Sequence, residues 1–149
     1  MKNIYCTLDT ETVGGAAHPT GMYNVGAIIH DRKGEILATT SLLVMEHYDE
    51  IALDSYAKKN FPVYAERLKT GKISAVATER EAYEVVKNLC DHYGVRYVMA
   101  YNSGFDFCKT CFRDLLDNFE FIDLYLMALE TITHKKSYAE YCREHGKRS

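Results

Sequence analysis

The sequence predicts a mixed α/β domain in which a sheet of about five strands is flanked by helices. Two observations lead to this prediction. Three apolar, strand-like segments come first in the chain and are separated by loops that contain glycine, which is typical of an antiparallel meander. Helical patterns then alternate with two further strand-like segments, which indicates parallel strands beside the meander. With 149 residues, one domain with a proper core is expected.

The expected meander takes up the first third of the chain. Its first strand begins at Ile4 and runs into the acidic residues that follow Leu8. The second strand, at 22–30, is apolar without clean alternation, which indicates that both of its faces are covered. A turn at 31–34 leads into the third strand, at 35–46.

Residues 47–77 show a weaker pattern. Two short helices are expected at 54–59 and 63–69, where basic residues are interleaved with Tyr56 and Tyr64. Such a surface could follow a phosphate backbone while the rings stack on bases. Solvated helix faces with tyrosine in the core explain the same residues, and we favour this interpretation. The basic residues are Lys58, Lys59, Arg67, Lys69 and Lys72.

The clearest helix follows Thr78. Thr78 and Glu81 form a capping box at its start, and Gly94 ends it. The helix crosses over to a strand at 96–101, which gives the sheet its parallel part. Its apolar face, at helical spacing, consists of Ala82, Val85, Val86, Leu89, Cys90 and Tyr93.

The last third of the chain is expected to hold three helices and one short strand. Apolar residues at 105, 108, 112, 115 and 116 predict a helix that packs back on the sheet. A strand at 120–123 follows, and helices at 124–133 and 137–145 come last. If the short helices at 54–59 and 63–69 are left out and the last two helices are counted together, the predicted order is β-β-β-α-β-α-β-α.

Composition is that of an ordinary globular protein, with 47% hydrophobic and 26% charged residues. The net charge of −3 gives no overall attraction to nucleic acid, so binding to nucleic acid would need a local basic patch. We expect neither a signal peptide nor a membrane-spanning segment. Five cysteines without a secretory signal favour reduced thiols and a cytoplasmic protein.

Acidic residues follow two of the predicted strands. Asp9 and Glu11 are two positions apart, so their side chains project from the same side of a strand and repel each other. Asp106 follows the strand at 96–101, at the end where open α/β sheets place their ligands. Hard divalent ions prefer carboxylate oxygens and would relieve the repulsion. A strand that simply runs into a polar turn before Gly14 is the alternative.

The same two segments resemble the first two motifs of the DEDD (DnaQ-like) superfamily of 3′–5′ exonucleases, and most of all its small phage-encoded members. Leu8 to Gly14 matches hydrophobic-Asp-x-Glu-Thr-x-Gly, with Val13 in place of the usual Thr, and Asn102 to Asp106 matches Asn-x-x-Phe-Asp. The resemblance covers nearly the whole chain. It implies a ribonuclease H-like fold that lacks its last helix.

The resemblance also implies roles for the motif residues. Two divalent ions, Mg²⁺ or Mn²⁺, about 4 Å apart, would hold the scissile phosphate, generate hydroxide and stabilise the departing 3′ oxygen. Asp9 would bridge both ions, Glu11 would bind the ion that activates water, and Asp106 would hold the second ion through water. The substrate would be the 3′ end of single-stranded DNA or RNA. Contacts to its terminal nucleotide would come from Thr12, Asn102 and Phe105.

The third motif of the superfamily, His-x4-Asp or Tyr-x3-Asp, does not occur between Asp106 and Ser149. Its Asp completes the metal-binding set, and its His or Tyr positions or deprotonates the attacking water. With three acids we expect one weakly bound ion and slow or absent turnover, since loss of a general base costs ~10²–10⁴-fold. Asp123, at a strand end, could approach the site, although such a residue more often begins the next helix.

Three interpretations of the missing motif stay open. Residues 1–149 are a C-terminally truncated exonuclease domain, a second polypeptide supplies the motif, or the protein binds rather than cuts. The last belongs to another class of function: a non-catalytic binding or inhibitor module, such as a phage factor acting on a component in the host cytosol. A sheet without its last helix leaves an apolar face open, so we expect a homodimer or a second chain to cover it.

A rival metal site is a zinc site built from the cysteines. Cys108-x2-Cys111 and Cys142-x2-His145 together offer four ligands of the zinc type. Both pairs lie in expected helices, and their separation exceeds the usual finger spacing. We therefore favour cysteines that serve as small core residues.

Overall fold

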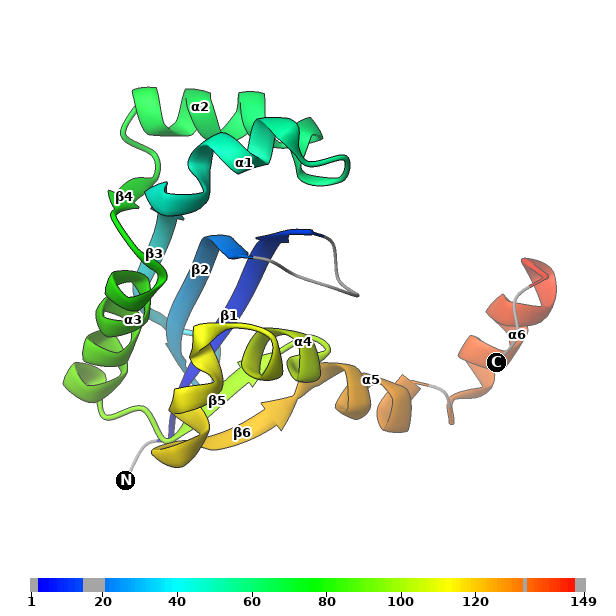
Figure 1. Cartoon of the computed structure of the whole chain (residues 1–149). Helices are drawn as coiled ribbons and strands as arrows, with labels where there is room; N and C mark the ends of the chain where they lie inside the picture. The colour runs from blue at the N-terminus through cyan, green and yellow to red at the C-terminus, as the bar shows by residue number, and fades with distance from the viewer. Residues whose placement is uncertain (1–2, 15–20, 133, 147–149) are drawn as a thin grey trace.

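A computed structural model describes residues 3–14, 21–132 and 134–146. Its centre is a mixed sheet of six strands, with helices on both faces (Figure 1). The strands are β1 (Ile4–Val13), β2 (Gly21–Asp31), β3 (Ile36–Val44), β4 (Ser74–Val76), β5 (Tyr97–Ala100) and β6 (Glu120–Asp123). Their order across the sheet is β4-β3-β2-β1-β5-β6. The predicted mixed α/β class is confirmed.

The helices are α1 (Tyr48–Leu53), α2 (Phe61–Lys69), α3 (Glu79–Tyr93), α4 (Ser103–Cys108), α5 (Leu124–Ile132) and α6 (Lys136–Glu144). Three 3-10 helices join them: η1 (Met45–His47), η2 (Ala57–Lys59) and η3 (Cys111–Asp117). In the part of the chain described here, no helix is long and apolar enough to cross a lipid bilayer.

The predicted antiparallel meander is confirmed, because β1 pairs with β2 and β2 with β3 in antiparallel register. α3 then crosses over, and β5 and β6 extend the sheet parallel to β1. The sixth strand, β4, pairs in parallel with β3. The sequence did not predict β4, because three residues are too short to show a strand period.

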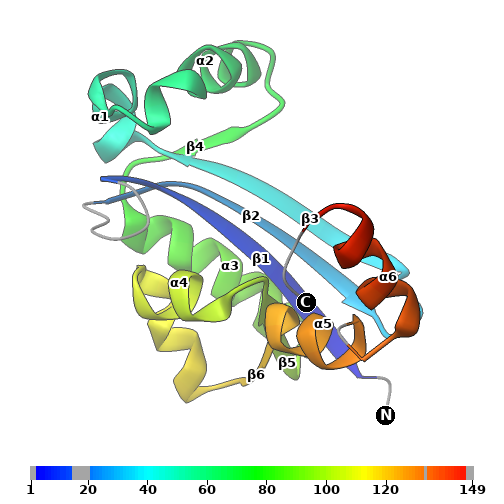
Figure 2. The ribbon, with the colours of Figure 1, turned by 90° about the vertical axis from the view of Figure 1, so that its right-hand side faces the viewer.

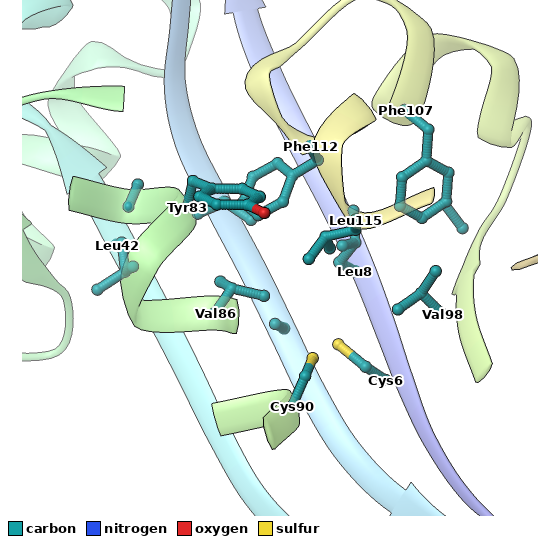
Figure 3. Packing of buried hydrophobic residues seen from close by; sticks show 14 of the residues in the cluster. Cys6, Leu8, Leu42, Tyr83, Val86, Cys90, Val98, Phe107, Phe112 and Leu115 are labelled. Atoms are coloured by element: carbon teal, nitrogen blue, oxygen red, sulfur yellow. The ribbon is translucent and has the colours of Figure 1, made fainter. Parts of the chain in front are cut away.

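One face of the sheet packs against α3, α4 and η3 (Figures 1 and 2). Side chains alternate along β1, so that Cys6 and Leu8 point toward this layer and are buried. There they meet Val86 and Cys90 of α3 and Phe112 of η3 (Figure 3). The resulting cluster is the larger of two cores.

The second core lies on the opposite face, where α1 and α2 cover one end of the sheet (Figure 1). Tyr23 of β2 and Leu43 of β3 are fully buried there, against Ile51 of α1 and Tyr64 of α2. β2 contributes to both cores, which confirms that both of its faces are covered.

α3 follows its sequence signals. The Thr78 hydroxyl accepts a hydrogen bond from the Glu81 N–H at 3.2 Å, and the Glu81 carboxylate accepts one from the Ala77 N–H at 2.8 Å. Gly94 ends the helix with φ = 63°, a left-handed conformation that glycine adopts without strain.

The single helix predicted from 105 to 116 is wrong. α4 ends at Cys108, and the chain restarts as η3. The cause is Thr110, whose hydroxyl donates to the Asp106 carbonyl and accepts from the Phe112 N–H at 3.2 Å. This side chain offers the backbone an alternative to continued helix. Cys108 is exposed as a result.

The helix expected at 54–59 is also replaced. Asp54 accepts hydrogen bonds from the N–H groups of Tyr56 and Ala57, at 2.8 and 2.7 Å, and so forms a turn between α1 and η2. The next helix starts earlier than its apolar pattern indicated, because Pro62 lies in its first turn, where its missing N–H costs nothing.

Candidate active site

Two of the predicted carboxylates project from β1, on the face opposite the larger core. Asp9 is exposed and Glu11 is half-buried, whereas Thr10 between them is buried. Asp9 lies opposite Gly26 of β2 in the sheet register. A Cβ added to Gly26 would meet nothing within 4 Å, so the surface beside Asp9 is open.

The third carboxylate, Asp106, reaches β1 from α4. The β1–β5 pairing ends at Thr7 and Met99, so the Thr10 N–H has no strand partner on that side. The Asp106 Oδ1 takes its place and accepts from both the Thr10 N–H, at 2.9 Å, and the Thr10 hydroxyl, at 2.6 Å. The side chain is only 2% exposed.

Burial raises the pKa of the Asp106 carboxyl from 3.8 to about 6. The two hydrogen bonds from Thr10 favour the ionised form and oppose this rise, and the negative charge of Asp9 adds to it. At neutral pH the carboxyl is therefore ionised, but its ionisation costs more free energy than in water because of desolvation and repulsion by Asp9.

Glu11 is oriented by the second core. Its carboxylate accepts a hydrogen bond from the Tyr23 hydroxyl at 3.5 Å, and that hydroxyl accepts one from Asn60 at 3.1 Å. Burial and the charge of Asp9 raise the pKa of Glu11, while Tyr23 and the positive charge of Lys59 lower it. The pKa of Asp9 is itself raised by partial burial.

The charge of Asp9 thus disfavours the ionised forms of both Glu11 and Asp106, and partial burial disfavours that of Asp9 itself. A nearby cation would relieve this cost. They are not yet arranged as a closed metal cage, since their oxygens do not form a group that lies within 4.8 Å of one another. Mg²⁺ and Mn²⁺ fit such an open set, because Mg²⁺ keeps several of its waters and needs only one or two direct carboxylates.

The residues predicted to contact a nucleotide lie in different environments. Thr12 is 5% exposed, just beyond a bulge in the β1–β2 pairing. Asn102 is exposed and begins α4 in the left-handed conformation, with φ = 59°. Phe105 is half-buried. Their contacts with a nucleotide stay predictions.

Asp123 takes the second of its two expected roles. Its carboxylate accepts from the N–H groups of Tyr125 and Leu126, which begins α5, and from the N–H and hydroxyl of Ser103 at the start of α4. Partial burial would raise the pKa of Asp123, but these hydrogen bonds outweigh it and lower the pKa. Asp123 therefore links the N-terminus of α4 to the N-terminus of α5.

The four candidate zinc ligands are not assembled among the described residues. Cys108 is exposed, Cys142 is buried on α6, and no group of ligand atoms within 4.8 Å includes Cys108, Cys111, Cys142 or His145. All five cysteines are free thiols, and Cys6 and Cys90 lie side by side in the larger core (Figure 3), as expected for core residues.

Thr10 was not predicted as part of the site, and Lys59 was named only among the basic residues that could follow a phosphate backbone. Thr10 anchors Asp106 across 96 positions of sequence, and no local pattern carries that information. Lys59 acts on Glu11 and also lies over the ring of the exposed Tyr56, with its Nζ 4.3 Å from the ring centre. The favoured interpretation, with both tyrosines in the core, holds for Tyr64, which is 7% exposed in the second core, but not for Tyr56, which is 56% exposed.

No protein-family model matches the sequence, and no curated protein is significantly similar to it. The function of the site is therefore inferred from its own residues.

Proposed function

We propose that this chain is a metal-dependent phosphodiesterase of the 3′–5′ exonuclease type, on a ribonuclease H-like fold, and that it acts on the 3′ end of single-stranded DNA or RNA. The observation that supports this most is the group of three carboxyls from β1 and α4, among which the pKa of Asp106 rises to about 6. Perturbed carboxyls that cluster at the carboxyl ends of strands are typical of functional sites.

Asp9, Glu11 and Asp106 would hold Mg²⁺ or Mn²⁺. When bound, such an ion polarises a phosphoryl oxygen and lowers the pKa of water. Asp9 is exposed, Glu11 is held by Tyr23, and Asp106 is anchored to Thr10 through its Oδ1. The motif match at Leu8 to Gly14 and Asn102 to Asp106 supports the same three residues.

Substrate would approach along Lys59 and Tyr56. With a net charge of −3, the protein needs a local cation to attract a phosphate backbone. Lys59 supplies one whose charge is felt at Glu11, and the exposed Tyr56 beside it offers a ring for base stacking.

Turnover by this chain is proposed to be slow, because the residues from Asp106 to Ser149 carry no third motif and hence no positioned base. The proposed setting is the cytoplasm, where five free thiols stay reduced.

The test is cleavage of a 5′-labelled single-stranded oligonucleotide in Mn²⁺. We expect a faint ladder shortened from the 3′ end, absent in Asp9→Asn and kept in Asp114→Asn, which removes an exposed acid of η3. A segment that bears His-x4-Asp, supplied in trans, should raise the rate by orders of magnitude. Equal cleavage by Asp9→Asn and the native chain would refute the assignment.

A non-catalytic binding or inhibitor module is the second candidate. The exposed apolar surface of α5 favours it, because such a surface fits a partner chain. In that case the oligonucleotide or a protein partner would bind without being cut, and binding would persist in Asp9→Asn.

A further inference from the structure

A second group of potential metal ligands lies where β3 ends and α3 begins. It consists of Glu46 and His47 of η1 and Glu79 of α3. The Nε2 of His47 lies 3.0 Å from the Glu79 Oε1 and 3.7 Å from the Glu46 Oε1, and all three ligand atoms lie within 4.8 Å of one another. None of these residues belongs to the β1 site.

The imidazole of His47 is fixed from two further directions. Its Nδ1 lies 3.1 Å from the Glu50 Oε1. Its ring also rests directly against the backbone of Gly21, since a Cβ placed there would lie 2.3 Å from the ring. The Nε2 is therefore held toward Glu46 and Glu79, and the His47 side chain is only 16% exposed.

The charges around His47 do not balance. Three carboxylates face it, and in the described residues the ion pairs of Glu46, Glu50 and Glu79 all go to this one histidine. A neutral imidazole carries a single N–H, yet both of its nitrogens face carboxylate oxygens. Both contacts are favourable only if a second proton or a metal cation supplies a further positive charge.

We propose that Glu46, His47 and Glu79 bind a divalent transition-metal ion of the Zn²⁺ class. Imidazole nitrogen and carboxylate oxygen are ordinary ligands of such ions, whereas Mg²⁺ prefers oxygen alone. Tetrahedral bonds of about 2.0–2.1 Å place ligand atoms roughly 3.3 Å apart. The separations of 3.0 and 3.7 Å lie on either side of this value. Glu50 on Nδ1 completes the carboxylate–histidine–metal arrangement typical of zinc sites.

The ion would stabilise the end of β1 that carries Glu11. The Glu79 Oε1 also accepts from the Met22 N–H, at 2.7 Å, at the start of β2. Met22 lies opposite Thr12 in the β1–β2 register. A metal ion on Glu79 would thus connect η1, α3 and β2 next to the acidic site of β1. This proposal does not depend on whether the β1 site cuts nucleic acid.

The test is calorimetric titration of the metal-stripped chain with ZnCl₂ at pH 7.5, followed by NMR of the histidine ring nitrogens. We expect one tightly bound ion per chain, distinct from any weak binding at the β1 site, and a shift of the His47 Nε2 resonance. Affinity should fall at least ~tenfold in Glu79→Gln and in Glu46→Gln, and by a similar factor in Glu50→Gln. Each glutamine keeps the oxygen that accepts the local hydrogen bonds, so the fold is retained, which circular dichroism would check.

Two controls locate the ion. Asp114→Asn, which removes an exposed acid outside both proposed sites, and Cys108→Ser should leave Zn²⁺ affinity unchanged. Loss of binding in Cys108→Ser instead would move the zinc to the cysteines and overturn the proposal. Absence of binding, or equal affinity in Glu79→Gln and the native chain, would also overturn it and leave His47 as a hydrogen-bonding partner of the carboxylates alone.

Discussion

At the scale of single residues, Asp106 makes the folded protein sensitive to pH. Its pKa is about 6 in the folded chain, against 3.8 for an unperturbed carboxyl. The folded state therefore binds this proton more tightly than the unfolded state does, and stability falls as pH rises from about 4 to above 6. At neutral pH the raised pKa of Asp106 lowers the free energy of unfolding by about 3 kcal/mol. Either protonation or a nearby cation would relieve this cost of the buried charge.

Asp106→Asn should stabilise the protein by about 1–3 kcal/mol at pH 7.5. The asparagine oxygen still accepts from the two donors of Thr10, while the cost of the buried charge disappears. Urea unfolding at pH 7.5 and near pH 4 measures the effect, which should shrink toward zero at the lower pH. A stabilisation that is the same at both pH values would mean that the charge of Asp106 is not its cause.

Thr10→Val tests the anchor itself. The change keeps side-chain volume and the N–H bond to Asp106 but removes the hydroxyl donor at 2.6 Å. We expect the pKa of Asp106 to rise above about 6, and the free energy of unfolding at pH 7.5 to fall by about 1.5–3 kcal/mol, as for a hydrogen bond to a charged group. Carboxyl ¹³C NMR across a pH titration reports the pKa, and an unchanged value would contradict the role given to Thr10.

The sequence predicts one part of this site and not the other. The shared face of Asp9 and Glu11 follows from the two-residue period of a strand, which is local and certain once β1 exists. The Thr10–Asp106 contact depends on where β5 stops, because that leaves the Thr10 N–H without a partner. No spacing between positions 10 and 106 encodes that event.

At the scale of elements, α3 shows which local sequence signals are sufficient to predict a helix and its two ends. Its cap at Thr78, its apolar face and its end at Gly94 are all local and agree with one another. α4 and η3 show the opposite case. Their apolar spacing is helical, but the bonds made by Thr110 break the helix, and spacing alone does not show which of two local options wins.

The caps of α3 carry a measurable share of stability. Thr78→Ala removes the acceptor for the Glu81 N–H and should cost about 1 kcal/mol. Gly94→Ala should cost a similar amount, about 1 kcal/mol, because alanine is strained at φ = 63°. Thermal or urea unfolding measures both, with the exposed Ser55→Ala as a control that should change little. A Gly94→Ala protein as stable as the native chain would show that this end of α3 relaxes freely.

At the scale of the whole molecule, burial is uneven along the chain. β1, β2 and β3 form the two cores with α1, α2 and α3, and α4 and η3 close the larger one. The C-terminal elements contribute little: no residue of α5 is buried, and Phe121 of β6 is 56% exposed. The order of most elements could be predicted from their periods. Which of them bury their apolar side chains could not, because that depends on neighbours.

α5 is apolar over most of its surface, and this predicts self-association or capture of a second chain. Leu126 and Met127 are 57% and 51% exposed, a state that apolar helix residues seldom keep when a partner is available. We expect sedimentation velocity to show the native chain shifting to larger species as its concentration rises. The double change Leu126→Lys, Met127→Lys should hold it as a monomer.

The matched control is Leu53→Lys, which charges the most exposed large apolar side chain of α1, at 85%. If the association is non-specific and hydrophobic, Leu53→Lys should weaken it as strongly as the α5 changes do. If α5 is a defined interface, only the α5 changes should weaken it. A native chain that stays monomeric at high concentration would show that the apolar side chains of α5 are tolerated in water. An association that only Leu53→Lys abolishes would move the interface to α1, next to the second core.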